Sequence, residues 1–164
     1  MIDDTDRTIL GLLQDNARLS NASLAEAVGM TASSVFERVK KLERRGVIVG
    51  YRAIVNAEKL GKPLLAFIRL TIGMEAHTEI DSVYGSVLEA CLSEPDVLEC
   101  HNVAGEDCYI LKVRAEGPKQ LENLLTTIRR KTRSSRSITN IVLSTYKDSS
   151  KVEPAPESQV DEEA

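Results

Sequence analysis

Residues 20–46 of the chain are SNASLAEAVGMTASSVFERVKKLERRG, and the spacing of their small, apolar and basic side chains decides the fold. Ser20 or Asn21 suits the N-cap of a first helix, because a short side-chain oxygen can accept from free N–H groups. Gly29 suits its end, where a left-handed backbone costs glycine least. Thr31 then suits the N-cap of a second helix. The stretch therefore predicts two short helices joined by a tight turn.

The second predicted helix carries two stripes along its length. The apolar stripe follows three- and four-residue steps, which is typical of a packed helix face, and consists of Val35, Val39 and Leu42. A polar, basic stripe follows the same steps beside it and consists of Ser34, Arg38, Lys41 and Arg45. Such a helix fits a DNA major groove. The alternative is an ordinary helical hairpin with a solvated charged face, but the small residues and the glycine at the turn favour a DNA-binding helix-turn-helix.

The charge of the chain is unevenly distributed. The net charge is −4, but residues 148–164 hold six acids and one base, so that the remainder has 20 bases and 19 acids. Residues 31–52 hold six bases and two acids. Phosphates act over about one Debye length, so the local charge governs groove binding and the acidic total does not exclude DNA.

The composition bounds the class of protein. The chain has 164 residues, 42% of them hydrophobic, and three cysteines that never form a C-x-x-C pair. We expect a soluble, cytoplasmic protein without membrane span or leader, with buried reduced thiols at Cys91, Cys100 and Cys108, and with no metal site, no cofactor and no catalytic constellation.

The elements on either side of the central stretch complete two domains. Residues 3–16 predict a first helix, residues 47–55 a strand, and Gly61 and Pro63 a break in the linker. Strands are expected at 64–73, 97–104, 108–115 and 138–146, and helices at 76–93 and 117–131. This βαββαβ order predicts a ferredoxin-like α+β sandwich with one bare, apolar sheet face that suits a dimer.

The two halves together resemble the Lrp/AsnC, or feast/famine, family of transcriptional regulators. The resemblance covers about residues 3–147. It is carried by DRTILGLLQDNARLSNASLAEAVGMT, by ERVKKLERRGVIVGY and by ECHNVAGEDCYILKV. It implies a winged helix-turn-helix domain at 1–46, a strand and linker at 47–63, and a ferredoxin-like effector and oligomerisation domain at 64–147. Residues 148–164 lie outside the match, and their proline, serine and acidic content predicts a disordered tail. It also implies homodimers, often assembled into octamers, with a small effector, usually an amino acid, between dimers.

The resemblance places the DNA site near the start of the second helix of the motif, at Thr31, Ser33, Ser34 and Arg38. Arginine can donate two hydrogen bonds to guanine, which gives about 1–3 kcal/mol of discrimination. Four further cations are interpreted as phosphate contacts that add affinity without sequence preference: Lys40, Lys41, Arg44 and Arg45. For Glu37, a helical ion pair with Lys41 is favoured over a base contact.

The resemblance places the effector site at Val103, Gly105, Asp107, Tyr109, Ser137 and Thr139. The backbone N–H groups at Gly105 could meet a carboxylate, and Asp107 an α-ammonium group. Alternatively, these two residues only form a hairpin turn. The basic run from Arg129 to Arg136 could contact wrapped DNA, but a solvated helix end is favoured.

Two other functions share this architecture. A sirohaem decarboxylase would need histidines around a tetrapyrrole, and the chain has only His77 and His101. An amino-acid sensor without DNA binding would not need the basic stripe. We therefore expect a regulator that binds double-stranded DNA and is not an enzyme.

Overall fold

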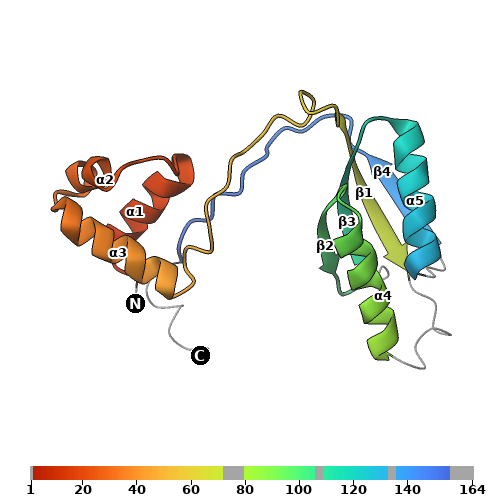
Figure 1. Ribbon diagram of the computed structural model, residues 1–164, viewed down its shortest axis with the longest axis horizontal. Helices are drawn as coiled ribbons and strands as arrows, with labels where there is room; N and C mark the ends of the chain where they lie inside the picture. The colour runs from red at the N-terminus through yellow and green to blue at the C-terminus, as the bar shows by residue number, and fades with distance from the viewer. Residues whose placement is uncertain (1, 72–79, 106–108, 133–135, 156–164) are drawn as a thin grey trace. The chain divides into compact units, whose positions relative to one another are not determined.

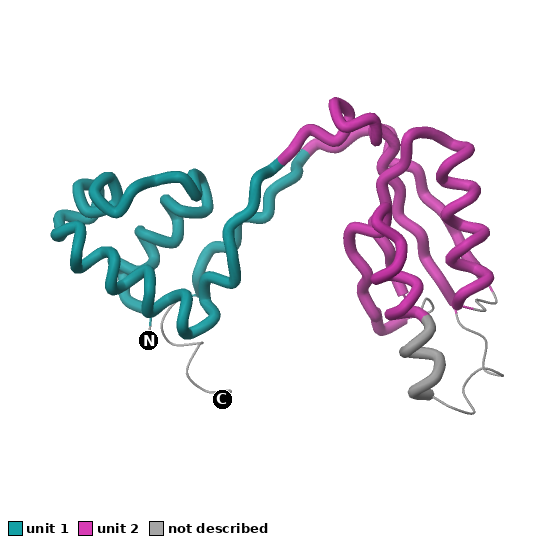
Figure 2. The backbone as a smooth tube through the Cα atoms, viewed as in Figure 1, with its two compact units in different colours: residues 1–54, 147–164 teal, residues 55–146 magenta. Residues whose placement is uncertain are grey.

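The computed structural model describes residues 2–71, 80–105, 109–132 and 136–155. The chain forms two compact units: the first is Met1–Ile54 with Lys147–Ala164, and the second is Val55–Tyr146 (Figure 2). The first unit contains three helices, α1 (Asp4–Asp15), α2 (Asn21–Val28) and α3 (Ala32–Arg44) (Figure 1). The helix-turn-helix predicted from residues 20–46 is thus confirmed.

The ends of these helices follow from local chemistry. The side chains of Asp3, Ser20 and Thr31 each accept a hydrogen bond from a backbone N–H of the first turn, as expected for N-caps. Gly29 ends α2 with φ 68°, a left-handed conformation that favours glycine. The short connection sets the angle between α2 and α3 in the helix-turn-helix.

One apolar core joins the three helices. Ile9 of α1, Leu24 of α2 and Val35 of α3 are each at most 1% exposed. Leu12, Leu13, Val28 and Met30 pack around them. The apolar stripe predicted on α3 is therefore the packed side of that helix, which fixes the opposite side as the one open to a partner.

The second unit is a four-stranded antiparallel sheet with two helices. Its elements are β1 (Leu64–Thr71), α4 (Ile80–Ser93), β2 (Val97–Asn102), β3 (Tyr109–Ala115), α5 (Pro118–Thr132) and β4 (Arg136–Ile141). The strand order is β2-β3-β1-β4, and α4 and α5 lie together on one side of the sheet (Figure 1). The predicted ferredoxin-like sandwich is confirmed.

The strand register separates the two faces of the sheet. Ile68 and Leu70 of β1 are fully buried and pack in one cluster with Leu121, Leu124 and Ile128 of α5. Neighbouring positions point the other way, because side chains alternate along a strand. Phe67 is accordingly 37% exposed on the face without helices.

Several boundaries differ from the predictions. Residues 47–55 do not form a strand in the described chain, because a strand needs a neighbour for its backbone hydrogen bonds. β4 begins and ends earlier than predicted, at Arg136 and Ile141. The apolar spacing in the helix expected at 76–93 also predicts Leu88 on the inward side, but Leu88 is 58% exposed.

The cysteines are only partly as expected. Cys91 and Cys100 are free thiols, and Cys100 is exposed because it lies on the edge strand β2. Burial, together with the Cys100 thiol nearby, raises the pKa of Cys91 to about 12. Cys108 lies outside the described residues.

The chain after β4 returns to the first unit. The Gln14 side-chain amide donates to the backbone oxygen of Val152 at 3.1 Å and accepts from its backbone nitrogen at 2.8 Å. Lys151 Nζ forms an ion pair with Asp15 at 2.9 Å. This part of the predicted disordered tail is therefore bonded to α1. In the part of the chain that the structure describes, no helix has the length and apolarity to span a membrane.

Candidate nucleic-acid interface and ligand site

The exposed face of α3 is the candidate nucleic-acid interface. Successive residues of an α-helix are rotated by about 100°. The buried Val35, Val39 and Leu42 therefore place the opposite side of the helix at Ser33, Glu37, Lys40, Lys41 and Arg44, which are all exposed. We call these five residues the outer face of α3.

Arg38 does not belong to the outer face. Its Nη1 lies 2.6 Å from Asp3 Oδ2 and 2.8 Å from Asp6 Oδ1, and the Asp6 side chain is only 8% exposed. The carboxylates of Asp3 and Asp6 therefore bind the cation that was expected to face outward, and a base contact of Arg38 stays a prediction. Arg38 stabilises the packing of α3 on α1 in this structure.

The same contact shifts two titrations. A hydrogen bond from the backbone N–H of Asp6, together with the Arg38 guanidinium, lowers the pKa of Asp3. Hydrogen bonds to Asp3 and Asp6 raise the pKa of Arg38. Asp3 and Arg38 are thus held in their charged forms at neutral pH.

The hydroxyls at the start of α3 form a local network. Thr31 Oγ1 lies 3.0 Å from Ser33 Oγ and 2.8 Å from Ser34 Oγ, and it accepts from the Ser34 backbone N–H. Thr31 is the N-cap and Ser34 is half-buried beside it, whereas Ser33 is exposed on the outer face. Of the three hydroxyls predicted to contact bases, Ser33 is the best presented.

The cations of the outer face differ in their partners. Lys40 Nζ forms an ion pair with Glu43 at 2.8 Å. Within the described chain, Lys41 and Arg44 form no ion pair, and neither does Glu37. The predicted Glu37–Lys41 pair is therefore wrong in this structure, and Lys40 pairs with Glu43 instead. Arg45 is exposed just after the helix, as its C-cap.

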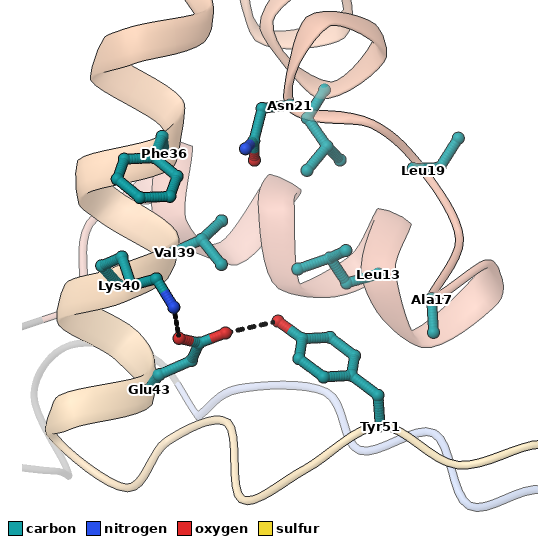
Figure 3. A pocket seen from close by; sticks show the side chains of 10 residues that line it. Leu13, Ala17, Leu19, Asn21, Phe36, Val39, Lys40, Glu43 and Tyr51 are labelled. Carbon is teal, nitrogen blue, oxygen red and sulfur yellow. Dashed lines mark hydrogen bonds and ion pairs between the residues drawn. The ribbon is translucent and has the colours of Figure 1, made fainter.

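A hollow of about 250 Å³ lies beside the outer face, between α3, α2 and the end of α1 (Figure 3). Phe36 forms one wall, and Lys40 lies 5.8 Å from the centre of its ring. Glu43 accepts from Tyr51 Oη at 3.1 Å, and the hydrogen bonds from Lys40 and Tyr51 lower the pKa of Glu43. The segment that follows α3 is thereby attached to the helix.

The sequence reasoning left two exposed residues of α3 without a DNA role, Phe36 and Glu37. Phe36 is 43% exposed although it is aromatic. The rotation from the three buried positions was the signal that could have identified Glu37 as an outer-face residue.

The candidate effector residues meet at one end of the sheet. β1 ends at Thr71 opposite the first residue of β4, and β2 ends at Asn102 opposite the first residue of β3. The described members of the predicted site gather there: Val103, Gly105, Tyr109, Ser137 and Thr139. Asp107 lies outside the described residues.

The register also places the side chains. Tyr109 and Ser137 are both partners of Leu70, and Thr139 is a partner of Ile68. Cross-strand partners share a face, so all three lie on the helix side of the sheet. Tyr109 is 6% exposed, whereas Ser137 and Thr139 are half-buried. Gly105 has φ 144°, a conformation that few other residues adopt.

The cations at the end of α5 form specific contacts. Arg129 Nε donates to Ser137 Oγ at 2.6 Å, and Lys131 forms an ion pair with Glu94 at 2.8 Å. These contacts are more than the solvated helix end that the sequence favoured. Arg133 lies outside the described residues.

No group of three or more potential metal ligands occurs among the described side chains. His101 is exposed on β2, with Nε2 3.4 Å from Glu99 Oε2. The sequence predicts His101 in the strand expected at 97–104, as a core or interface residue. The strand is confirmed and the core position is wrong, whereas the interface position stays a prediction. His77 lies outside the described residues.

Comparison with known proteins assigns both units. A winged helix-turn-helix DNA-binding model matches residues 2–49, and the Lrp/AsnC ligand binding domain matches residues 66–152. Together they cover most of the chain in the order that the fold shows. The protein is thus a two-domain, DNA-binding transcriptional regulator, and it belongs to the Lrp/AsnC family.

Individual relatives agree with this assignment. The HTH-type transcriptional regulator LrpA of Mycobacterium tuberculosis is 36% identical over 146 residues, which cover 88% of this chain and 92% of LrpA. The leucine-responsive regulatory protein of Haemophilus influenzae is 36% identical over 126 residues, covering 77% of this chain and 74% of the relative. Relatives named as transcriptional regulators do not favour the decarboxylase alternative.

Solved structures of regulators share the fold. The feast or famine regulatory protein of M. tuberculosis, solved with L-methionine, has a TM-score of 0.83 and 32% identity, covering 94% of this chain and all of the other. A transcriptional regulator of Neisseria meningitidis, also solved with L-methionine, has a TM-score of 0.81 and 28% identity over 93% and 96% of the chains.

Proposed function

We propose that this regulator binds the major groove of double-stranded DNA with the outer face of α3. The observation that carries this proposal is the direction of that face. The core fixes one side of α3, and Lys41 and Arg44 extend from the other with no ion pair in the described chain to neutralise them. Unpaired cations on a helix of this width suit a phosphate-lined groove.

The proposal revises the roles of the predicted DNA residues. Ser33 is the hydroxyl that contacts bases, and Lys40, Lys41, Arg44 and Arg45 contact phosphates. Thr31 and Ser34 support the start of the helix. Arg38 positions α3 on α1 through Asp3 and Asp6 and contacts no base.

The experiment is a DNA titration at several salt concentrations with wild type, Lys41→Ala and Arg44→Ala. Each variant should weaken binding to all duplexes alike and reduce the salt slope by about 1, because each lost phosphate contact releases about one counterion less. Lys119→Ala, which removes an exposed cation of the other unit, is the matched control. Equal affinities and slopes for all four proteins would contradict the proposed interface.

We further propose that an amino acid bound at the end of the sheet modulates DNA binding or assembly. Two related regulators were solved with L-methionine. The strand ends bring Gly105, Tyr109, Ser137 and Thr139 to the same end of the sheet. Backbone N–H groups at Gly105 would bind the effector carboxylate, and Asp107 its ammonium group.

A thermal-shift screen of the twenty amino acids tests the effector proposal. A ligand that binds only the folded protein raises its apparent stability by mass action. Asp107→Ala should abolish the shift, whereas Glu116→Ala, an exposed acid of the same unit, should preserve it. An effector that changes DNA affinity must have its own affinity changed by DNA to the same extent, which a repeat titration with DNA present measures.

The assembly is proposed to be a dimer through the bare sheet face, with octamers formed from dimers. Two copies of the DNA-binding unit would then bind two half-sites about one helical turn apart. The relatives named above are bacterial proteins, and bacterial DNA lies in the cytoplasm, so we propose that this protein acts there.

A further inference from the structure

Glu37 is a negative charge in the middle of a basic surface. It is exposed on the outer face of α3, and in the described part of the chain its side chain has neither a hydrogen bond nor an ion pair. Among the described residues, the cations of the same face either pair with another acid, as Lys40 does with Glu43, or have no ion pair, as is the case for Lys41. Glu37 therefore does nothing visible for the stability of the helix.

A carboxylate on a surface that enters the groove is unfavourable unless it meets a donor. It lies among phosphates of the same sign, so it lowers the affinity for any duplex. The compensating donors in the major groove are the exocyclic amines of the bases. Glutamate can accept a hydrogen bond from cytosine N4. In adenine, the N6 amine lies beside N7, a hydrogen-bond acceptor that repels a carboxylate.

Phe36 is the neighbouring feature without a role. The ring is 43% exposed, on the second turn of α3. Its inner edge borders the hollow of Figure 3, and Lys40 Nζ lies 5.8 Å from its centre, which holds the ring in place. Among the groups in the major groove, the thymine C5-methyl is the one that gains from contact with an apolar ring.

We propose that Phe36 and Glu37 determine the sequence preference of this regulator, Glu37 by accepting from N4 of a cytosine and Phe36 by contacting the methyl group of a nearby thymine. This rests on the proposed docking of the outer face of α3. It assigns the base-reading role to the second turn of α3 and leaves Arg38 in its ion pairs with Asp3 and Asp6. The preferred half-site therefore contains a C·G pair and a T·A pair within the reach of adjacent helix residues.

The first experiment removes single methyl groups from the DNA. A preferred duplex is selected with the wild-type protein from a randomised pool, and each thymine is then replaced by deoxyuridine. One replacement should weaken wild-type binding roughly 4-fold, as expected for one buried methyl group. Phe36→Ala should bind the thymine and deoxyuridine duplexes equally.

The second experiment exchanges the acceptor. Glutamine forms paired hydrogen bonds with N6 and N7 of adenine. Glu37→Gln should therefore change the preference at one position from C·G to A·T, by about 10-fold in each direction. Glu89→Gln, the same exchange at an exposed position of α4, should leave the selected sequence unchanged. Circular dichroism checks that all variants fold, which the exposure of the changed side chains favours.

Each outcome decides the proposal. If wild type selects no sequence at all, the proposed DNA interface fails together with this inference. If wild type selects a sequence but Glu37→Gln selects the same one, or if no deoxyuridine replacement distinguishes wild type from Phe36→Ala, the interface stands and the assignment of Phe36 and Glu37 is overturned.

Discussion

Arg38 and Lys41 are both cations of α3, but we expect Arg38 to contribute to the stability of the fold and Lys41 to contribute only to DNA binding. The Arg38 side chain is 30% exposed and bonded to Asp6, which is almost fully buried. Arg38→Ala leaves that carboxylate without its partner, so we expect a loss of about 2–3 kcal/mol in the free energy of unfolding, less than for a fully buried pair. Lys41→Ala should lose almost nothing. Amide hydrogen exchange at Ile9 and Leu10 measures the change in the free energy of unfolding for both variants.

These measurements distinguish a positioning role of Arg38 from direct recognition of bases by Arg38. If Arg38 contacted bases directly, its loss would relax the preference at one base pair and leave exchange in α1 unchanged. If it positions α3, its loss should accelerate exchange in α1 and weaken binding to all sequences alike. The second pattern is the one that the distances to Asp3 and Asp6 predict.

The pKa of Asp3 adds a pH dependence to the same contact. The unfolded value is 3.8 and the folded value is lower. The stabilisation is thus fully present above pH 3.8 and is lost as the pH falls through the lowered folded pKa. Asp3→Asn should be less stable than wild type at neutral pH, and this difference should disappear at the acid end. Urea unfolding followed by circular dichroism at several pH values tests this, and a constant difference would contradict it.

At the scale of the element, the turn between α2 and α3 depends on Gly29. Its φ of 68° disfavours any residue with a Cβ, although no atom lies within 4 Å of the position where that Cβ would be. Gly29→Ala should therefore lower the free energy of unfolding by about 1–2 kcal/mol through backbone strain alone. Gly11 also has open space but lies inside α1, so Gly11→Ala should raise stability by about 0.5–1 kcal/mol. Thermal melts should show a lower melting temperature for Gly29→Ala and a higher one for Gly11→Ala. Equal shifts in melting temperature would exclude backbone strain as the cause.

The helices and the order of the strands could be predicted from the sequence because they depend on local signals. Thr31 and Gly29 mark helix ends through their own side chain or backbone, and Val35, Val39 and Leu42 show the packed face by their spacing. The direction of Arg38 could not be predicted, because it depends on carboxylates about thirty residues away that only the packing of α1 on α3 brings near. The failure of residues 47–55 to form a strand has a similar origin, since β-rich composition does not supply a neighbouring strand.

For the whole molecule, the bare face of the sheet is where a second copy is expected to bind. Phe67 is 37% exposed at the centre of β1, between Lys112 of β3 and Asn140 of β4. Large apolar side chains on an uncovered sheet mark a protein interface. In a two-fold dimer each copy presents the same patch, so a single substitution changes the interface twice.

Phe67→Glu should therefore separate the dimer with little effect on the fold of the monomer. Two carboxylates would face each other in a desolvated interface, a cost that usually exceeds several kcal/mol. Leu88→Glu places the same charge at an exposed position of α4, away from the sheet, and serves as the control. Light scattering gives the mass of each protein, and circular dichroism confirms folding. A Phe67→Glu protein that keeps the mass of wild type would place the dimer interface elsewhere, whereas a monomer that binds DNA more weakly would show that two copies must act together at two half-sites.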